Sequence, residues 1–223
     1  IALLINQNEI HEDLKDLFNS KTFDPSKIEA LLDKYNVSPE MLFQRMTNIL
    51  PHKMGVKNLF FLRFNNDNNS DTYYLNKELH LNKLHNPHGN RIAEHYCRRW
   101  ITIDVLKDLS KQQTKKKENG NIIKAQRSSY IDSENEYLCI SIARSMYPTP
   151  NSNSSVTLGL LVNDKLKKGV KFLDNPKIVT KKVNATCERC RLTDCKERVA
   201  PPLVVDKMIK NKAIEEEINE LIN

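Results

Sequence analysis

Glycine is scarce in this chain, with only 5 among 223 residues. Neither the G-x-x-x-x-G-K-[ST] pattern of P-loops nor the G-x-G-x-x-G pattern of dinucleotide-binding folds occurs. Both patterns need glycine where the backbone approaches a phosphate closely. The scarcity of glycine therefore disfavours nucleotide-hydrolysing and Rossmann-type functions.

Long apolar runs and targeting segments are missing as well. The longest apolar runs, such as Leu59 to Leu62, are far shorter than the roughly 20 residues that a membrane span requires. The apolar stretch that opens at Ile1 has neither a basic region before it nor a small-residue cleavage site after it, so it does not resemble a signal peptide. We expect a cytoplasmic protein without membrane contact. Because the chain opens on Ile rather than Met, we also expect a fragment of a longer protein.

Cysteine is present in an odd number, 5, and three of these residues lie between Cys187 and Cys195. An odd count with such crowding fits reduced thiols and a metal site better than a disulfide framework. The chain also carries 35 Lys and Arg against 28 Asp and Glu, a net charge of +7. Lysine-rich surfaces are often only solubilising, so the charge alone does not identify a polyanionic partner.

The hydrophobic pattern predicts helices first and a sheet afterwards. Apolar residues recur at helical spacing through the first fifty residues, and the Asp24-Pro25 and Ser38-Pro39 pairs mark two helix starts, since Asp or Ser caps a helix and Pro suits its first position. After Pro51 the period changes to two. We expect strands over residues 59–64, 72–75, 79–84, 137–144 and 156–162, and further helices over 90–100, 103–109 and 206–223.

These elements predict an α+β fold in three parts. Helices fill residues 1–52, a mainly antiparallel sheet with flanking helices fills 53–180, and a small cysteine segment with a C-terminal helix fills 181–223. The last helix has an apolar stripe at Ile214, Ile218 and Leu221. Since short isolated helices rarely persist in water, this stripe needs a partner surface, within the chain or on another subunit.

Three expected strands place a cation at the end of an apolar face. Alternation puts Arg63, Lys83 and Arg144 each on the same side as the apolar residues of its own strand, because successive side chains of a strand point to opposite faces. One such cation is ordinary at the rim of a core. Three together predict a pocket with an apolar floor and a cationic mouth, suited to a ligand that carries phosphates at one end and an acyl arm at the other.

Cys187, Cys190 and Cys195 form a C-x2-C-x4-C pattern in a polar segment that also contains Arg189, Arg191, Lys196 and Arg198. Cations beside a thiol favour the thiolate, which is the form that binds metal. Three thiolates leave a tetrahedral or cubane site one ligand short. Cys97 is the preferred fourth ligand, and a mixed site through His88 or His95 remains open, as does the choice between iron–sulfur and zinc. Cys139 lies in a strongly alternating strand and is expected to be a core residue.

The run CERCRLTDCKERVAPPL, residues 187–203, resembles the cysteine motif near the carboxyl end of Xre-type bacterial transcription regulators that respond to short-chain acyl-CoA. The resemblance extends upstream. The opening ALLINQ is similar to the end of the IrrE-like domain of those regulators, and the segment 36–50 and the runs FFLRF, LHLNKL and CISIAR occur in the same order. Where family members carry Gly-x-Cys-Pro, this chain reads His85-Asn-Pro-His88-Gly.

The resemblance implies a non-enzymatic sensory region of a homo-oligomeric regulator. It implies a GAF-like sheet between the remnant of an IrrE-like domain and the cysteine segment, with CoA or a short-chain acyl-CoA as ligand, bound in the pocket at Arg63, Lys83 and Arg144. It also implies a [4Fe-4S] cluster, with zinc as the alternative, on Cys187, Cys190, Cys195 and either Cys97 or His88. Contact with DNA would come from an N-terminal helix-turn-helix that is absent from this chain.

Two other functions compete with this reading. Residues 31–50 have the pattern of a helix-turn-helix, which places its second helix in the DNA major groove. The histidines around His88 would instead suit an IrrE-like metallopeptidase fragment, although the H-E-x-x-H pattern of that activity does not occur, and that pattern is what sets two histidines and a general base on one helix face.

Overall fold

The computed structural model describes residues 4–68, 70–81, 94–115, 120–146, 149 and 151–222. Its elements are α1 (Gln7–Asn19), α2 (Pro25–Tyr35), α3 (Pro39–Ile49), η1 (Leu50–Met54), β1 (Leu59–Asp67), β2 (Tyr73–His80), α4 (Ile101–Thr114), β3 (Ile122–Tyr130), β4 (Glu136–Ser145), β5 (Ser152–Leu161), α5 (Asp164–Gly169), β6 (Val179–Val183) and α6 (Leu203–Ile222). No helix in these ranges is both long and apolar enough to cross a membrane.

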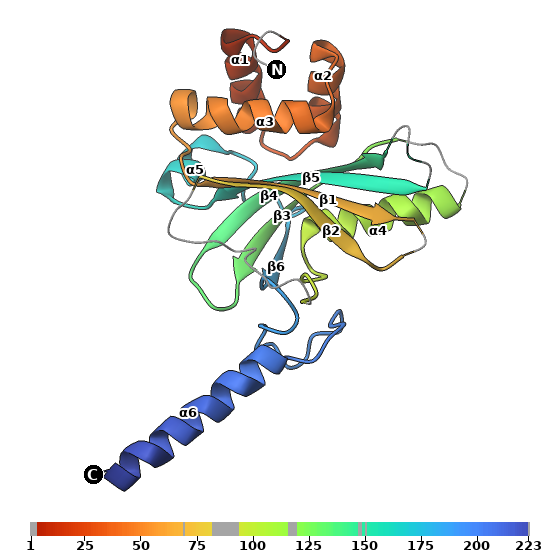
Figure 1. Cartoon of the computed structure of the whole chain (residues 1–223). Coiled ribbons are helices and arrows are strands. Elements are labelled where there is room, and N and C mark those ends of the chain that lie inside the picture. The colour runs from red at the N-terminus through yellow and green to blue at the C-terminus, as the bar shows by residue number, and fades with distance from the viewer. Residues whose placement is uncertain are drawn as a thin grey trace.

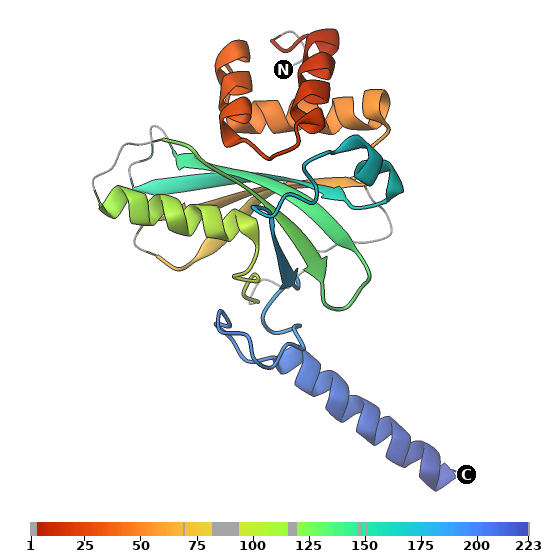
Figure 2. The same cartoon turned by 180° about the vertical axis from the view of Figure 1, so that it is seen from behind.

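The fold has three layers, with α6 projecting away from them. Helices α1 to α3 lie over one face of the sheet and α4 lies on the other (Figures 1 and 2). The described strands form one six-stranded sheet in the order β2-β1-β5-β4-β3-β6. All neighbouring pairs are antiparallel except β3 and β6, which are parallel. The expected α+β fold with a mainly antiparallel sheet and flanking helices is therefore confirmed.

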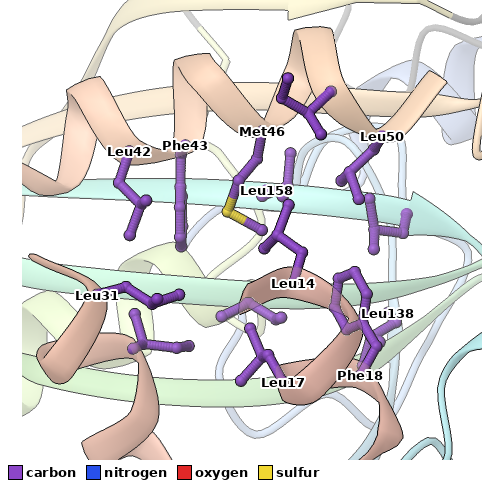
Figure 3. Close-up of a cluster of buried hydrophobic side chains, with 14 of the residues drawn as sticks. Leu14, Leu17, Phe18, Leu31, Leu42, Phe43, Met46, Leu50, Leu138 and Leu158 are labelled. Carbon is purple, nitrogen blue, oxygen red and sulfur yellow. The ribbon is translucent and has the colours of Figure 1, made fainter. Parts of the chain in front are cut away.

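The central strands are buried on both faces because two hydrophobic cores meet at the sheet. Along β1, Leu59 and Phe61 join the core under α1 to α3, whereas Phe60, Leu62 and Phe64 join the core on the α4 side. Figure 3 shows the first of these cores. Side chains of α1, α2 and α3 there point toward Leu138 of β4 and Leu158 of β5.

The helices of residues 1–52 and the sheet are one packing unit. They share the first core, whose members run from Ile5 in the N-terminal segment to Ile178 just before β6. A domain has its own hydrophobic core. The boundary expected at residue 52 lies inside a stretch whose residues on both sides belong to the same core. The boundary expected at 180 falls inside β6, which pairs with β3.

The predicted helix starts are confirmed. The side chain of Asp24 accepts a hydrogen bond from the Ser26 amide at 3.0 Å, and that of Ser38 accepts one from the Met41 amide at 3.3 Å. Each bond satisfies an amide that has no partner inside the first turn of its helix.

Several element predictions need correction. The expected strands over 72–75 and 79–84 share the single strand β2 up to His80, and residues 82–93 lie outside the described part of the chain. The helix expected over 90–100 is wrong for residues 94–100, which form a β-bridge and a turn before α4. The strands β3 and β6 and the short helix α5 were not predicted.

The strand β3 escaped prediction because its buried polar residues mask the alternation. Gln126 is buried, and its amide donates to the Arg99 carbonyl at 3.1 Å and to the Ser128 hydroxyl at 2.9 Å. Buried polar side chains are tolerated when they are hydrogen-bonded in this way, but a pattern of apolar residues does not reveal them.

A close approach in the sheet yields a stability prediction. Gly159 of β5 faces Phe60 of β1, and a Cβ at Gly159 would lie 2.1 Å from Cζ of the Phe60 ring. Since Phe60 is buried and packs on Tyr137, the ring has little room to move. We expect Gly159→Ala to lower the free energy of unfolding by about 1–3 kcal/mol, measured by urea denaturation.

Gly169 provides the matched control, because nothing lies within 4 Å of a Cβ placed there. Gly169→Ala is expected to change the stability by less than about 1 kcal/mol. Equal stabilities of the two variants would contradict the assigned packing of Phe60 on Gly159.

Candidate metal centre

Four of the five cysteines line one cavity below the sheet. Cys97, which precedes α4, lies there with Cys187, Cys190 and Cys195 of the loop between β6 and α6. The first three are buried, and Cys195 is partly exposed. The structure therefore places Cys97, the preferred fourth ligand, at the same cavity as the C-x2-C-x4-C motif. His88 lies outside the described residues.

A short β-bridge brings Cys97 to the motif. Tyr96 pairs antiparallel with Thr186. The Cys97 amide donates to the Ala185 carbonyl at 3.1 Å, and the Cys187 amide donates to the His95 carbonyl at 2.9 Å. Because bridged backbones are held side by side, two cysteines that are 90 residues apart in sequence are fixed as neighbours.

Two glutamate side chains, one from each of the bridged segments, hydrogen-bond to the other segment. The Glu94 carboxylate, whose side chain is 7% exposed, accepts two hydrogen bonds from the Arg189 guanidinium, both at 2.7 Å, and one from the Thr186 hydroxyl at 2.8 Å. Bidentate guanidinium–carboxylate pairs are strong and geometrically specific. In the opposite direction, the buried Glu188 accepts from the His95 amide at 3.0 Å and lies 2.7 Å from His95 Nδ1.

The side chain of Arg198 stabilises the cysteine loop through hydrogen bonds to backbone carbonyls of the loop. Its guanidinium donates to the carbonyls of Cys187 at 2.7 Å, of Cys190 at 3.0 Å and of Ala200 at 3.3 Å, and also to the carbonyl of Leu192. A loop this polar has no apolar core of its own, and one arginine satisfies four of its carbonyls. The positions of Cys187 and Cys190 therefore depend on a side chain beyond the third cysteine.

The cations of the motif have different surroundings. Of the four arginines and lysines named from the motif, Arg198 lines the cavity, Arg189 is paired with Glu94, and Arg191 lies 3.8 Å from Asp132. Burial raises the pKa of Cys97 to about 11, partly offset by backbone hydrogen bonds and increased further by the nearby Cys187 and Cys190. Cys97 stands outside the cation-rich motif, and at this residue burial is the larger effect and favours the neutral thiol.

Cys139 is a core residue, as predicted. It lies in β4, is buried, and belongs to the core on the α4 side. Burial raises the pKa of this thiol to about 12. It does not line the cavity of the other four cysteines.

The donor set fits a thiolate-bound metal group. Within the described ranges, no three His, Cys, Asp or Glu side chains lie close enough together to hold one metal ion, although four cysteines share a cavity. A single zinc ion needs sulfurs at about 2.3 Å from one point. Four cysteines are the ligand number of a [4Fe-4S] cluster, in which each sulfur binds a different iron, and also of a tetrahedral zinc site.

Arg98 adds a second observation that fits an anionic group. Its side chain is buried, lines the same cavity, and lies 4.7 Å from the ring centre of Tyr73. Its two terminal nitrogens donate to backbone carbonyls, but its Nε has no hydrogen-bond partner among the described residues. A buried N–H without a partner is costly, and a metal-bound sulfur in this cavity would accept it.

Arg63 and Arg144, two of the three cations assigned to the CoA pocket, do come together. They line a cavity of about 50 Å³ with Glu40 and Ser154. Arg63 is paired with Glu40 at 2.8 Å and donates to the Ser154 hydroxyl at 3.2 Å, and Lys77 is also 2.8 Å from Glu40. Lys83 lies outside the described residues.

The apolar floor expected beside Arg63 and Arg144 is covered, since Leu59, Phe61 and Ile142 are buried in the core under α1 to α3. Leu79 and Leu81, expected beside Lys83, are exposed. The cavity is large enough for one phosphate-sized group but far below the roughly 300–1,000 Å³ of ligand pockets. Alternation shows which face of a strand is apolar but not which element covers it, so the larger pocket stays a prediction.

The helix-turn-helix pattern of residues 31–50 does form two helices, and the second of them, α3, packs one face against the sheet. It lies over the sheet beside helices α1 and α2 (Figures 1 and 2), with Leu42, Phe43 and Met46 buried. Arg45 is partly buried, and Glu40 is engaged with Arg63 and Lys77. A recognition helix must present side chains to the groove; on the outer face of α3, Asn48 is exposed and Gln44 is partly exposed.

No protein-family model, curated protein or solved structure matches this chain.

Sequence reasoning missed Glu94, Glu188 and Arg98 as parts of the site. Glu94 and Arg98 stand within three residues of Cys97, and Glu188 stands between two motif cysteines. Their nearness to cysteine was the available signal. Their roles became visible only through contacts between segments more than 90 residues apart, such as the 2.7 Å contact between His95 and Glu188.

Proposed function

We propose that this chain is the sensory region of a bacterial transcription regulator, in which Cys97, Cys187, Cys190 and Cys195 hold a [4Fe-4S] cluster and CoA or a short-chain acyl-CoA is the ligand. The observation that carries the metal proposal is the meeting of Cys97 with the C-x2-C-x4-C motif at one cavity. Zinc on the same cysteines is the alternative. When bound, an iron–sulfur cluster supplies a redox-active centre whose state depends on its ligands and surroundings.

The other residues of the site position the four thiols. Arg189 and Glu94 hold the segment with Cys97 against the segment with Cys187, and Arg198 sets the loop carbonyls. The amides of Val204 and Val205 at the start of α6 donate to the Glu188 carbonyl at 3.1 and 3.4 Å. Since Glu188 stands between two of the thiols, a change in the cysteine loop would reach α6 directly.

The acyl-CoA proposal rests on the family resemblance and on the side-by-side position of Arg63 and Arg144. The guanidinium of Arg144 is exposed, and a phosphate would compete with Glu40 for Arg63. The acyl-pantetheine arm of the ligand needs a surface other than this small cavity. A groove of about 680 Å³ lined by Tyr73, Tyr96 and Arg98, among others, has the size of a ligand site. A ligand would act by binding one state of the regulator better than another.

Anaerobic purification followed by an absorption spectrum and elemental analysis tests the metal proposal. We expect a broad band near 400 nm and about four iron and four sulfide per chain, as thiolate-bound [4Fe-4S] clusters contain. Colourless protein with about one zinc per chain would replace the cluster by the zinc alternative. Protein that contains neither iron nor zinc would overturn both the cluster proposal and the zinc alternative.

Isothermal titration calorimetry with acetyl-CoA and propionyl-CoA tests the ligand proposal separately. We expect binding heat and a rise in melting temperature with ligand concentration, since a ligand of the native state stabilises it by mass action. If neither compound gave binding heat or a thermal shift at high excess, acyl-CoA would be excluded as the ligand. Arg144→Glu is expected to weaken binding if a phosphate lies at the small cavity.

A further inference from the structure

Most of the net positive charge of the chain lies in three short segments. Residues 20–27, 52–57 and 163–178 contain nine lysines and three aspartates, and no arginine or glutamate. The rest of the chain holds 26 of the 35 Lys and Arg and 25 of the 28 Asp and Glu, so it is nearly neutral. The net charge of +7 is therefore local. The nine lysines are Lys21, Lys27, Lys53, Lys57, Lys165, Lys167, Lys168, Lys171 and Lys177.

The tertiary structure brings the segment 163–178 against the other two. Helix α5 lies beside the end of α3 and the turn η1 in both views (Figures 1 and 2). The side chain of Lys165 crosses Gly55, because a Cβ at Gly55 would lie 2.1 Å from Lys165 Nζ. At the end of α1, the Lys171 amide donates to the Phe18 carbonyl at 2.8 Å. The lysines of α5 and of the loop after it thus lie beside those of 52–57 and 20–27.

The loop after α5 also reaches the start of α2. Hydrogen bonds from Ser26 are the main cause of the lowered pKa of the Asp24 carboxyl, and the charges of Lys27 and Lys177 contribute to it. Two lysines from segments far apart in the sequence therefore lie near the same carboxylate. We refer to the nine lysines as the lysine surface.

The segment 163–178 buries its apolar side chains and exposes its lysines. Leu166, Val170 and Phe172 are buried, whereas all five lysines of the segment are exposed. The ring centre of Phe172 lies 6.2 Å from that of Phe18 and 5.6 Å from that of Phe23. The lysines therefore project from a backbone that is packed against the helical layer.

The charge of the lysine surface is not neutralised within the protein. All nine lysines are exposed. In the part of the chain that the structure describes, none of the nine forms an ion pair; the paired lysines are those at positions 15, 34, 77, 111, 124, 181 and 212. Of the three aspartates, Asp24 caps α2 and Asp174 is paired with Arg127. A surface of one sign repels itself and attracts a polyanion.

The composition of the lysine surface favours one class of polyanion. All residues of the three segments are described, and none of them is an exposed aromatic or other large apolar residue. Proteins that bind single-stranded nucleic acid stack bases on aromatic side chains, and helices at membrane surfaces bury apolar side chains in the lipid. Lysine binds phosphate as a point charge, and a duplex presents about one negative charge per 1.7 Å of its axis. A duplex phosphate backbone fits best.

We propose that the lysine surface binds the phosphate backbone of duplex DNA without reading its sequence. The choice of DNA over an RNA duplex rests on the proposed function as part of a transcription regulator, whereas the phosphate contact rests on the lysines alone. This contact would add to that of a sequence-reading helix-turn-helix outside this chain. The lysine surface contains none of the cysteines and neither Arg63 nor Arg144, so it is separate from the metal and ligand sites.

Fluorescence anisotropy of a labelled 30-base-pair DNA duplex, titrated with the full chain, tests the proposal. We expect a dissociation constant in the micromolar range at about 50 mM salt. For about five phosphate contacts, the log–log slope of affinity against salt is about −4 to −5, so the affinity should fall several-hundredfold by about 200 mM. A second duplex of unrelated sequence is expected to bind equally well, within about twofold.

The triple variant Lys165→Gln, Lys168→Gln, Lys171→Gln is expected to raise the dissociation constant about tenfold or more at 50 mM salt. Each lost phosphate contact lowers the steepness of the salt dependence by about one, so the slope should become shallower by about two to three. Because the three side chains are exposed and unpaired among the described residues, the urea midpoint should stay that of the wild type.

The triple variant Lys207→Gln, Lys210→Gln, Lys212→Gln is the matched control. It removes the same charge from exposed positions of α6, which lies at the opposite end of the molecule from α5 in both views (Figures 1 and 2). We expect it to keep the slope and to change the affinity less than about threefold. Metal content and acyl-CoA calorimetry of both triple variants should equal those of the wild type, which separates this result from the metal and ligand proposals.

Four results would overturn the proposal. The first is no binding of duplex DNA at 50 mM salt, and the second is an equal loss in the two triple variants. The third is an equal loss in Gln44→Ala, which would assign the contact to α3. The fourth is tighter binding, per phosphate, to a 30-base-pair RNA duplex or to vesicles of phosphatidylserine and phosphatidylcholine than to DNA.

Discussion

The Cys190→Ser variant is expected to bind less than about a tenth of the metal that the wild-type chain binds. Cys190 is buried at the cavity that Cys97, Cys187 and Cys195 also line. Serine is a much weaker ligand than a thiolate, because its hydroxyl does not ionise near neutral pH. Because a metal that binds only the folded chain stabilises it by its binding energy, we also expect the variant to lose several kcal/mol of stability relative to the loaded wild type. Elemental analysis and thermal unfolding measure both effects.

Cys139→Ala is the matched control for the cysteine variants. Cys139 is equally buried but lies in the core on the α4 side of the sheet, away from the cavity. We expect it to keep the full metal content while losing about 1–2 kcal/mol of stability. Cys97→Ser tests the fourth ligand separately. If Cys97→Ser kept the metal and Cys190→Ser lost it, a ligand other than Cys97 would complete the site.

Arg198→Met is expected to destabilise the cysteine loop strongly while leaving all thiols in place. It removes four hydrogen bonds to the loop carbonyls of Cys187, Cys190, Leu192 and Ala200. Hydrogen bonds from charged donors contribute about 1.5–3 kcal/mol each, but water can reach a partly exposed loop. We therefore expect a loss of about 2–4 kcal/mol in the stability of the loop, and a metal affinity reduced about 10–100-fold.

Hydrogen exchange of the loop amides and a competition titration with a chelator measure these two effects. Arg198→Lys is expected to fall between wild type and Arg198→Met, because an ammonium group cannot reach four carbonyls as a planar guanidinium does. Arg191→Met is the control. Arg191 is exposed and lies 3.8 Å from Asp132, so we expect a change within about 0.5 kcal/mol. Equal effects at Arg191 and Arg198 would contradict the role assigned to Arg198.

Several features of the fold could be predicted from the sequence because they depend on near neighbours along the chain. The starts of α2 and α3 follow from Asp24-Pro25 and Ser38-Pro39, and their caps form as expected. The alternation around Cys139 placed this residue in a buried strand, and β4 contains it. The spacing of Ile214 and Ile218 predicted the last helix, and α6 includes both residues.

Other features could not be predicted because they depend on what covers a surface. The pattern placed Arg63 and Arg144 on apolar faces, and the structure brings these two side chains to one cavity. It could not indicate that α3 lies on those faces and supplies Glu40 to Arg63. For the same reason, the helix-turn-helix pattern described two real helices without showing that the second one is buried against the sheet.

The sequence by itself determined that three cysteines stand together in a polar loop, that Cys139 belongs to the core, and that the last helix has one apolar stripe. The tertiary structure alone decided that Cys97 joins the other three cysteines and that α6 extends beyond every other element. The physical reason is the range of the interactions. Caps and stripes act over two to eight residues, whereas the Tyr96–Thr186 bridge and the Glu94–Arg189 pair join segments 90 or more residues apart.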